Sequence, residues 1–397
     1  MIKRNFMDKL LDGVEVEWKP LGEALVRTKG TNITAGQMKE LHKINAKLKI
    51  FAGGKTIAFV DFEDIPKKNI NREPSIIVKS RGVIEFEYYD KPFSHKNEMW
   101  SYHSKNENIN IKFVYYFLKI NELYFQNIGS RMQMPQIATP DTDKFKIPIP
   151  PLKVQEEIVR ILDAFTELTA ELTVELTARK KQYEYYRDKL LTFEEGEVEW
   201  KALGEVCGYV DYRGKTPKKT SNGIFLVTAK NIRMGYIDYQ SSQEFISEDD
   251  YDLIMRRGLP EVGDVLITTE APCGFVAQVD QKNIALAQRV IKYRSKDERF
   301  TNAFLKHYLM GGEFQKKLHE AATGSTVKGI KGSKLHKLTI PIPSLAEQNR
   351  IVSILDKFDA LTNSITEGLP REIELRQRQY EYYRNLLLSF PKSEVEA

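Results

Sequence analysis

The sequence predicts an α+β protein in which two globular domains alternate with two long helices. A stretch that opens with Ile-Pro-Ile-Pro and then turns helical occurs twice, at 147–193 and at 340–390. Each copy carries apolar residues at alternating steps of three and four, which is the spacing of a coiled-coil seam. Between the copies lie regions of short strand-like runs separated by glycine, asparagine and lysine turns. We therefore expect the two helices to pack on each other as an antiparallel coiled coil.

The seam of the first helix can be followed over most of its length, and the second copy repeats it. The first seam contains Ile158, Ile161, Phe165, Leu168, Leu172, Leu176, Tyr183, Tyr186 and Leu190, and the second contains Ile351, Ile354, Phe358, Leu361, Ile365, Tyr380, Tyr383 and Leu387. The second copy differs by four extra residues, with Gly368 and Pro370 among its sequence ITEGLPREIE. Proline inside a helix removes a backbone hydrogen bond, so a break or kink is predicted there.

A second repeated motif shows that the chain is a circularly arranged two-fold repeat. Asp-Lys-Leu-Leu occurs at 8–11 and at 188–191, and it is followed by VEVEWKPLGE at 14–23 and by VEWKALGE at 198–205. The N-terminal segment therefore resembles the C-terminal part of a long helix, and we expect it to lie near the end of the second long helix. The predicted domains are a helical tail (1–13), a first globular domain (14–150), a central long helix (151–195), a second globular domain (196–343) and a C-terminal long helix (344–397).

Composition restricts the class of protein only loosely. The chain has 397 residues, a formal net charge of +5 and two cysteines, which are far apart. Such a length accommodates two or three domains, and the small basic excess permits nucleic-acid binding only where the charge is clustered. Neither a disulfide framework nor a zinc site is predicted. With no signal peptide and no long apolar run, we expect a soluble protein of the reducing cytoplasm.

The chain shows no set of residues that predicts catalysis. Gly-Lys-Thr at 54–56 and 214–216 resembles the end of a phosphate-binding loop, but Lys49 and Tyr209 stand where the first glycine is required. Asp264 and Glu270 are expected at a solvated strand end rather than in a nuclease site. His307 and His319 fall in predicted helices and are expected on the surface. The six histidines form no evident metal-ligand set, so no catalytic or metal site is predicted.

Basic residues cluster with polar and aromatic ones inside both globular domains. Glycine-flanked basic loops suit phosphates, whereas arginine, glutamine and asparagine can hydrogen-bond base edges. The candidates in the first domain are Lys55, Arg81, His95, Lys96, Arg131, Gln133 and Gln136, with Trp100 beside them; those in the second are Arg213, Lys215, Thr216, Lys218, Lys219, Lys230, Arg233, Gln288, Arg289, Ser325, Thr326, Lys328 and Lys331. For any single residue, an ordinary loop side chain is the alternative, and only the clusters together favour DNA.

The repeated motif resembles that of one known family. IPIP-x-L-x-x-Q-x-x-I-V-x-I-L-D, followed by Gln-Tyr-x-Tyr-Tyr-Arg, occurs twice, and GDVLITTEAPCG at 263–274 and ALAQRVI at 285–291 look like recognition-domain segments. On these residues the chain resembles the specificity subunit of Type I restriction–modification enzymes, in particular the subgroup called type IC. The likeness covers nearly the whole architecture: two target-recognition domains alternating with two helical regions.

The resemblance implies a non-catalytic DNA-recognition subunit. In the family, each recognition domain binds one half of an asymmetric, bipartite DNA sequence. Two modification subunits bind S-adenosylmethionine and methylate adenines, and two restriction subunits use ATP to translocate and cleave DNA. No cofactor is expected on this chain, because S-adenosylmethionine, ATP and Mg belong to partner subunits. A coiled-coil adaptor that joins two proteins without reading DNA is the alternative.

The helices then serve as a spacer and as a docking surface. A helix of about forty residues is ~60 Å long, which corresponds to roughly 18 base pairs. Thr-Ala-Glu-Leu at 169–172 and Thr-Val-Glu-Leu at 173–176 form a tetrapeptide repeat, whose number is associated with gap length in the family. The predicted docking residues are present in both copies, as a pair of identical partners requires: Gln182, Tyr185 and Arg187, and again Gln379, Tyr382 and Arg384.

Overall fold

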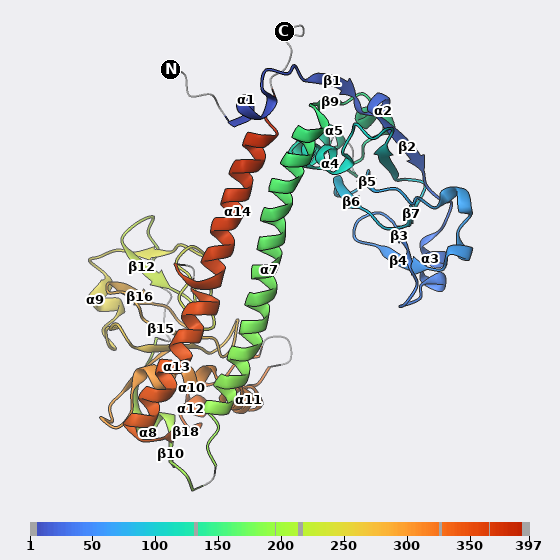
Figure 1. Ribbon diagram of the computed structural model, residues 1–397. Coiled ribbons are helices and arrows are strands. Elements are labelled where there is room, and N and C mark those ends of the chain that lie inside the picture. Colours follow the sequence, from blue (N-terminus) through green and yellow to red (C-terminus); the bar gives the residue numbers. More distant parts are fainter. Residues whose placement is uncertain are drawn as a thin grey trace, which may run out of the picture. The chain divides into compact units, whose positions relative to one another are not determined.

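The computed structural model describes residues 6–130, 134–194, 196–212, 217–324, 328–364 and 366–390, and it divides into two compact units (Figure 1). Unit 1 consists of Met1–Ala170 and Leu375–Ala397, and unit 2 of Glu171–Glu374. Each unit combines one globular head with portions of both helical regions. Unit 2 is thus one continuous stretch of chain, whereas unit 1 is assembled from two separate stretches.

Unit 1 contains a head of short strands and helices and shares its two long helices with unit 2. Its own elements are α1 (Phe6–Leu11), β1 (Glu17–Pro20), α2 (Leu21–Ala24), β2 (Leu25–Lys29), α3 (Ala35–Leu41), β3 (Leu48–Phe51), β4 (Ile57–Val60), β5 (Ser75–Lys79), β6 (Glu85–Tyr89), β7 (Phe93–His95), β8 (Trp100–Ser104), α4 (Ile111–Ile120), α5 (Glu122–Gly129), α6 (Thr139–Asp143) and β9 (Lys146–Ile149). The shared helices are α7 (Leu152–Leu190) and α14 (Gly368–Leu387).

Unit 2 is built from a corresponding series of elements. They are β10 (Glu199–Ala202), α8 (Leu203–Val206), β11 (Cys207–Asp211), β12 (Ile224–Val227), β13 (Phe245–Ile246), α9 (Tyr251–Ile254), β14 (Val265–Thr268), β15 (Val276–Gln278), β16 (Ile284–Leu286), β17 (Val290–Ser295), α10 (Asn302–Met310), α11 (Gly312–Ala321), α12 (Gly332–Leu335), β18 (Thr339–Ile342) and α13 (Leu345–Asn363).

The two heads have the same strand order although their sequences do not visibly match. Head 1 has a four-stranded sheet in the order β2-β8-β5-β6, and head 2 has one in the order β11-β17-β14-β15. A three-stranded sheet accompanies each, β4-β3-β7 and β13-β12-β16, with one antiparallel and one parallel pairing in both. The heads are thus two versions of one α+β scaffold.

The Ile-Pro-Ile-Pro stretches are the second strands of small antiparallel ribbons. Ile147 of β9 pairs with β1, and Ile340 of β18 pairs with β10 in the same register. A proline is tolerated at such an edge, where its missing N–H interrupts no central ladder. The tryptophan of each ribbon packs edge-on against the head: Trp18 lies 5.9 Å from the ring of Phe117 and Trp200 lies 6.5 Å from that of Tyr308.

The first predicted long helix is confirmed, and the second is interrupted where glycine and proline predicted a break. α7 runs for 39 residues, or about 58 Å at 1.5 Å per residue. α13 ends at Asn363, and α14 begins at Gly368. Gly368 has a φ of +73°, and a Cβ placed there would lie only 2.3 Å from the carbonyl oxygen of Ala360. The seam residue Ile365 lies outside the described residues.

The helical regions pair within each unit through stacked aromatic rings. In unit 1 the ring of Phe165 stacks on that of Tyr383 at 5.4 Å, and in unit 2 the ring of Phe358 stacks on that of Tyr186 at 5.9 Å. Early positions of one helical region lie beside late positions of the other in both cases. The predicted antiparallel pairing is therefore present in each unit.

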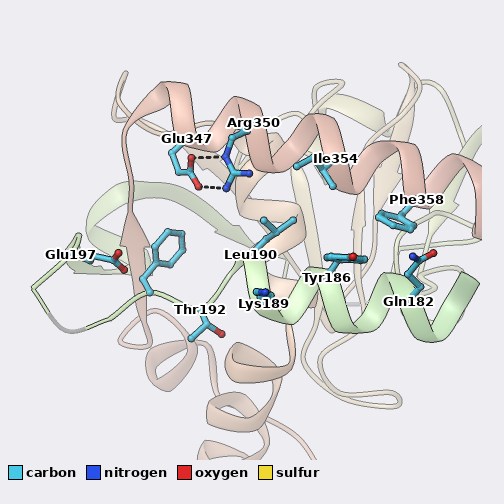
Figure 2. Close-up of a pocket in the computed structure, with 11 residues that line it drawn as sticks. Gln182, Tyr186, Lys189, Leu190, Thr192, Glu197, Glu347, Arg350, Ile354 and Phe358 are labelled. Carbon is cyan, nitrogen blue, oxygen red and sulfur yellow. Dashed lines mark hydrogen bonds and ion pairs between the residues drawn. The ribbon is translucent and has the colours of Figure 1, made fainter.

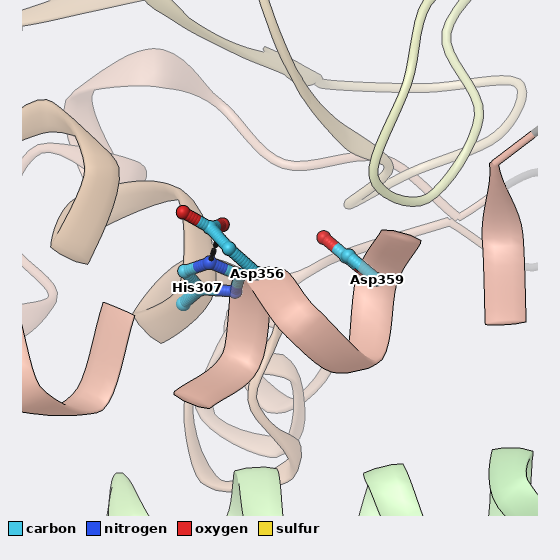
Figure 3. A group of neighbouring side chains, drawn as sticks. All are labelled: His307, Asp356 and Asp359. Carbon is cyan, nitrogen blue, oxygen red and sulfur yellow. Dashed lines mark hydrogen bonds and ion pairs between the residues drawn. The ribbon is translucent and has the colours of Figure 1, made fainter. Parts of the chain in front are cut away.

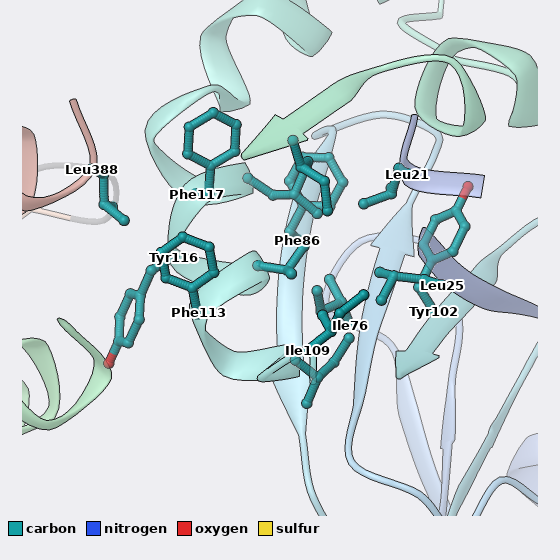
Figure 4. Packing of buried hydrophobic residues seen from close by; sticks show 14 of the residues in the cluster. Leu21, Leu25, Ile76, Phe86, Tyr102, Ile109, Phe113, Tyr116, Phe117 and Leu388 are labelled. Carbon is teal, nitrogen blue, oxygen red and sulfur yellow. The ribbon is translucent and has the colours of Figure 1, made fainter. Parts of the chain in front are cut away.

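The core of unit 1 includes residues of the head, of α1 and of the end of α14 (Figure 4). Met7 and Leu11 of α1 belong to the same buried cluster as Leu387 and Leu388 at the end of α14. Phe113 of α4 packs edge-on against Phe390 at 5.9 Å. The predicted neighbourhood of the N-terminus and the end of the second helical region is confirmed. Among the described residues, no helix is long and apolar enough to cross a membrane.

Candidate nucleic-acid interface

A buried glutamine fastens each head to the start of a helical region. The side chain of Gln155 accepts a hydrogen bond from the N–H of Asn110 at 2.8 Å and donates to the carbonyls of Asn108 and Pro150 at 3.0 and 2.7 Å. Gln348 does the same with the N–H of Thr301 at 2.9 Å and with two backbone carbonyls at 2.7 and 2.9 Å. Asn110 and Thr301 are the N-caps of α4 and α10. The glutamine of the repeated motif thus joins the N-terminus of α4 or α10 to the end of the Ile-Pro-Ile-Pro strand and the start of the following helix.

An aspartate eight residues further on, about two helical turns, makes the second contact. In unit 1, Asp163 accepts from Tyr116 Oη at 2.5 Å and pairs with Lys112 at 2.7 Å. In unit 2, the same place in the motif is held by Asp356, which bonds to His307 Nε2 at 2.7 Å. Both contacts join the head's helix, α4 or α10, to the neighbouring helix of the spacer.

His307 is a core residue, which corrects the expectation that it lies on the surface (Figure 3). Its ring is fully buried, and burial lowers its pKa although the hydrogen bond to Asp356 acts in the other direction. Asp356 and Asp359 approach it closely enough to resemble a metal-ligand group. Lys306, however, reaches both carboxylates, at 3.5 and 3.2 Å. The ammonium group of Lys306 already provides the cation there. The cluster is therefore a group of ion pairs that joins α10 to α13 rather than a metal centre.

A strand end and a loop form the same corner in both heads. In head 1, Arg81 follows β5 and bridges to Gln136, so two predicted DNA contacts lie side by side. In head 2, Glu270 follows β14 and bridges to Gly329 in the same antiparallel manner. We call this place the reader corner: Arg81 and Gln136 mark it in head 1, Glu270 and Gly329 mark it in head 2, and the residues next to these bridges belong to it. The sheets place the corner at the same position in both heads, but the side chains at that position differ.

The reader corner of head 2 lines a concave site of about 470 Å³. It brings together three residues of the predicted DNA-contacting set, namely Gln288, Arg289 and Lys331, with Glu270 among them. Arg289 Nε lies 2.7 Å from Glu270 Oε1, and Arg289 has a φ of +72°, which side chains other than glycine rarely adopt. Lys328, close by in sequence, is exposed.

Several other predicted contacts are exposed on loops, some of them within ion pairs. Lys55 lies on the exposed turn between β3 and β4, next to Gly54 with its φ of +67°. Lys218 and Lys230 are exposed, and Lys219 pairs with Glu244 at 2.8 Å. Arg233 pairs with Asp238 at 3.2 Å and donates to the carbonyl of Lys230 at 2.8 Å, so it is held on its own loop.

His95 is not available to a nucleic acid, which corrects its inclusion among the predicted contacts. It is completely buried, and its ring nitrogens lie 3.2 Å from Ser101 Oγ and 3.1 Å from the carbonyl oxygen of Lys96. Burial lowers its pKa, so the ring is neutral and part of the core. Trp100 is also buried and donates to Thr142 Oγ1 at 3.1 Å. Lys96 stays near the surface in a 2.8 Å pair with Glu98.

Seven of the predicted contacts lie outside the described residues and stay predictions. They are Arg131, Gln133, Arg213, Lys215, Thr216, Ser325 and Thr326.

Asp264 is buried rather than solvated, which corrects a third expectation. It is 1% exposed and lies 2.5 Å from Arg294 Nε and 3.4 Å from Lys292 Nζ. Burial lowers the pKa of Lys292 even though the carboxylate opposes this shift. The group ties β14 to β17 and offers no nuclease carboxylate.

The predicted docking residues lie on the helices of both copies in matching surroundings. Tyr185 and Tyr382 are 59% and 65% exposed. Arg187 lies 5.6 Å over the ring of Tyr183, and Arg384 lies 5.5 Å over that of Tyr380. The amides of the two glutamines are oriented alike, because Gln182 accepts from Arg179 at 2.7 Å and Gln379 accepts from Arg376 at 2.9 Å.

In unit 2 a groove runs beside this surface (Figure 2). It has a volume of about 760 Å³ between the end of α7 and the start of α13, and Gln182, Tyr186 and Phe358 line it. An ion pair between Arg350 and Glu347, with a distance of 2.6 Å, also lines the groove on its α13 side.

Reasoning from the sequence missed the fastening residues and the role of the strand ends. The signal for Gln155 and Gln348 was present, since each follows its Ile-Pro-Ile-Pro at the same spacing. The equivalence of Arg81 and Glu270 had no such signal, because it appears only once β5 and β14 are placed in matching sheets.

Comparison with known proteins gives consistent matches over nearly the whole chain. A family model described as Type I restriction modification DNA specificity domain matches residues 31–179 and 195–375. The chain is similar to the Type I restriction enzyme EcoR124I/EcoR124II specificity subunit of Escherichia coli, with 38% identity over 100% of this chain and 99% of the relative. It is 31% identical to the Escherichia coli EcoprrI specificity subunit, over 92% and 93% of the two chains.

Solved structures show the same fold. The crystal structure of a Type I restriction-modification S subunit from M. genitalium aligns with a TM-score of 0.60 and 16% identity, covering 96% of this chain and 98% of that one. A chain from a study of complex assembly and conformational transition in a type I R-M system aligns with a TM-score of 0.55 and 17% identity, covering 94% and 98%.

Proposed function

The chain belongs to the family of Type I restriction-modification DNA specificity subunits, and we propose that it reads one asymmetric, bipartite DNA sequence, with one half bound by each head. A coiled-coil adaptor without DNA reading is not favoured by this membership. The observation that carries the proposal is the reader corner. One scaffold presents Arg81 and Gln136 in head 1 but Glu270, Arg289 and Lys331 in head 2. Two heads of equal topology with unlike polar side chains suit two unlike half-sites.

Exposed lysines on loops and turns supply the contacts to phosphates. Lys55, Lys218 and Lys331 are exposed on loops, where they can approach the backbone of a duplex. Each phosphate contact should contribute about one unit to the dependence of binding on the logarithm of salt concentration.

The helices space the two half-sites and dock the modification subunits. α7 is one continuous helix that contributes its first part to unit 1 and its last part to unit 2. A stiff helix of this kind suits a spacer, and inserting Thr-Ala-Glu-Leu after Leu176 would lengthen it by about 6 Å. Tyr185 and Tyr382, exposed in matching surroundings, suit a pair of identical partners.

The chemistry belongs to partner subunits in this proposal. Two modification subunits would bring S-adenosylmethionine and the adenine methylation, and two restriction subunits would bring ATP, Mg and cleavage. The residues of this chain bind, orient and space the DNA. The protein would act where the host DNA is, in the cytoplasm.

Selection of bound sequences from random duplex DNA tests the function. The full chain, assembled with its modification subunit, should enrich two short blocks with a fixed gap. The Thr-Ala-Glu-Leu insertion should widen the gap by one or two base pairs (~6 Å at roughly 3.4 Å per pair) and leave both blocks unchanged. No enrichment at any salt concentration would overturn the proposal, and altered blocks would overturn the spacer role.

A further inference from the structure

The reader corners of the two heads contain equivalent positions that can be matched through their hydrogen bonds, of which all but the one from the Ser80 hydroxyl join backbone groups. In head 1, Ser80 accepts from the N–H of Ile137 at 3.0 Å, and its hydroxyl donates to the carbonyl of Glu98 at 2.5 Å. In head 2, Thr269 accepts from the N–H of Ile330 at 2.9 Å, and its own N–H donates to the carbonyl of Arg289 at 2.8 Å. Ser80 therefore corresponds to Thr269, and Glu98 corresponds to Arg289.

The strand registers support this match independently. β5 pairs with β8 and β14 pairs with β17, with Val78 opposite Trp100 and Thr268 opposite Val290. Continuing each register past the last pair puts position 80 opposite 98 and position 269 opposite 289. The second residue after each strand is then Arg81 in head 1 and Glu270 in head 2.

The two equivalent positions carry opposite charges in the two heads. Head 2 has a carboxylate beyond the strand, Glu270, and its partner is the guanidinium of Arg289 on the neighbouring chain segment, 2.7 Å away. Head 1 has the guanidinium of Arg81 at the place of Glu270 and the carboxylate of Glu98 at the place of Arg289, and Glu98 pairs there with Lys96 at 2.8 Å. Burial acts against ionisation of Glu98, but the hydrogen bond from Lys96 and the positive charges of Lys96 and Arg81 outweigh it and lower the pKa. One corner thus holds the same pair of charges as the other with the two places exchanged.

Structural stability does not account for the pair in head 2. The side chains of Arg289 and Glu270 are 51% and 44% exposed, and ion pairs of such exposure contribute little to folding. Arg289 also adopts a left-handed backbone conformation that is unfavourable for a residue with a Cβ. Backbone strain of this kind is concentrated at binding sites, where surrounding structure holds a side chain in a required direction.

The carboxylate of Glu270 favours a base pair over a phosphate as the part of DNA that binds in the corner. A phosphate approaching Arg289 would also approach Glu270, and the two negative charges would repel each other. A G·C base pair instead offers both partners in the major groove. Guanine O6 and N7 accept from arginine, and the cytosine N4 amino group donates to a carboxylate.

We propose that the arginine–carboxylate pair in each reader corner recognises one G·C base pair, and that the exchanged charges make the two heads recognise it in opposite orientations. Arg289 with Glu270 reads it in head 2, and Arg81 with Glu98 reads it in head 1. This inference rests on the proposed function and assigns to each half-site one base pair and the residues that select it.

Exchange of the charges in head 2 is the sharpest experiment. The full chain, assembled with its modification subunit, is used for selection from random duplex DNA. Four forms of the chain are compared: the unchanged chain, Glu270→Gln, Arg289→Gln and the double variant Glu270→Arg/Arg289→Glu. Each single variant should relax discrimination at one position of the second half-site by about 5- to 150-fold, and the first half-site should not change. The double variant should restore discrimination at that position with G·C replaced by C·G.

The controls separate this inference from the proposed function and from misfolding. Glu298→Gln removes an exposed carboxylate of the same head outside the corner, and it should leave both half-sites unchanged. Thermal unfolding of each assembled complex shows whether a variant is folded. An unchanged chain that selects no bipartite sequence would overturn the function itself. A bipartite sequence whose base preferences survive both single variants, or survive the exchange without inversion, would overturn only the arginine–carboxylate readout.

Discussion

His307 occupies in unit 2 the place that Tyr116 holds in unit 1, and each side chain reaches the aspartate of the repeated motif. The distances are 2.7 Å from His307 Nε2 to Asp356 and 2.5 Å from Tyr116 Oη to Asp163. Both rings fasten a head helix to the spacer. Only the histidine can change its charge near neutral pH, so the two contacts respond differently to acid.

Acidification should weaken unit 2 selectively. Burial lowers the pKa of His307 below the value of about 6.5 for an exposed histidine. As the pH falls below 6.5, the unfolded chain binds a proton that folded unit 2 does not, so the free energy of unfolding decreases, by up to about 1.4 kcal/mol per pH unit. Hydrogen exchange between pH 8 and pH 5.5 should show protection falling more in α10 than in α4. His307→Gln, which cannot titrate there, should remove this difference; equal losses in both helices would contradict the assignment.

Removal of a fastening glutamine should destabilise the unit that contains it. Gln155→Leu leaves the N–H of Asn110 and two backbone carbonyls without their partner, and each such loss typically costs about 1–3 kcal/mol. Denaturant unfolding should show a decrease of several kcal/mol in the stability of unit 1, and Gln348→Leu should do the same in unit 2. Gln240→Leu, the same change at an exposed position, should alter stability by less than about 0.5 kcal/mol.

The interruption between α13 and α14 should depend on glycine. Gly368→Ala places a methyl group against the Ala360 carbonyl and forces a left-handed conformation that alone costs about 1–2 kcal/mol. Thermal unfolding should therefore show a clear loss of stability. The matched change Gly36→Ala, in the first turn of α3, where the nearest atom to the added methyl group is Thr34 Oγ1 at 3.8 Å, should be neutral or stabilising. Equal behaviour of the two variants would mean that the backbone at 368 is not constrained.

The exposed tyrosines should contribute to docking in pairs. Tyr185→Ala and Tyr382→Ala remove large exposed rings, 59% and 65% accessible, so neither change should lower the stability of the isolated chain. Truncating an aromatic residue at the centre of an interface typically costs at least about 2 kcal/mol of binding. Titration with the modification subunit should show one weakened site for each single variant and two for the double variant. Leu253→Ala, an exposed apolar truncation in head 2, is the matched control.

The sequence predicts the helical framework well because its signals are local. The three- and four-residue spacing defines α7, and Gly368 and Pro370 mark the break before α14. The common fold of the heads could not be predicted, because their strands have only two to six residues and pair across long stretches of chain. His307 and Asp264 were misplaced on the surface for the same reason, since their partners are 49 and 30 residues away.

The composition of the two units sets an order for folding during synthesis. Unit 2 is a continuous stretch, Glu171–Glu374, whereas unit 1 joins Met1–Ala170 with Leu375–Ala397. When a ribosome has translated the codon for Glu374, every residue of unit 2 has been made, but the core of unit 1 still lacks Leu387, Leu388 and Phe390. Head 1 is therefore translated first, but the core of its unit is completed last. A premature stop codon in the final helix would remove part of the core of unit 1 rather than part of the core of unit 2.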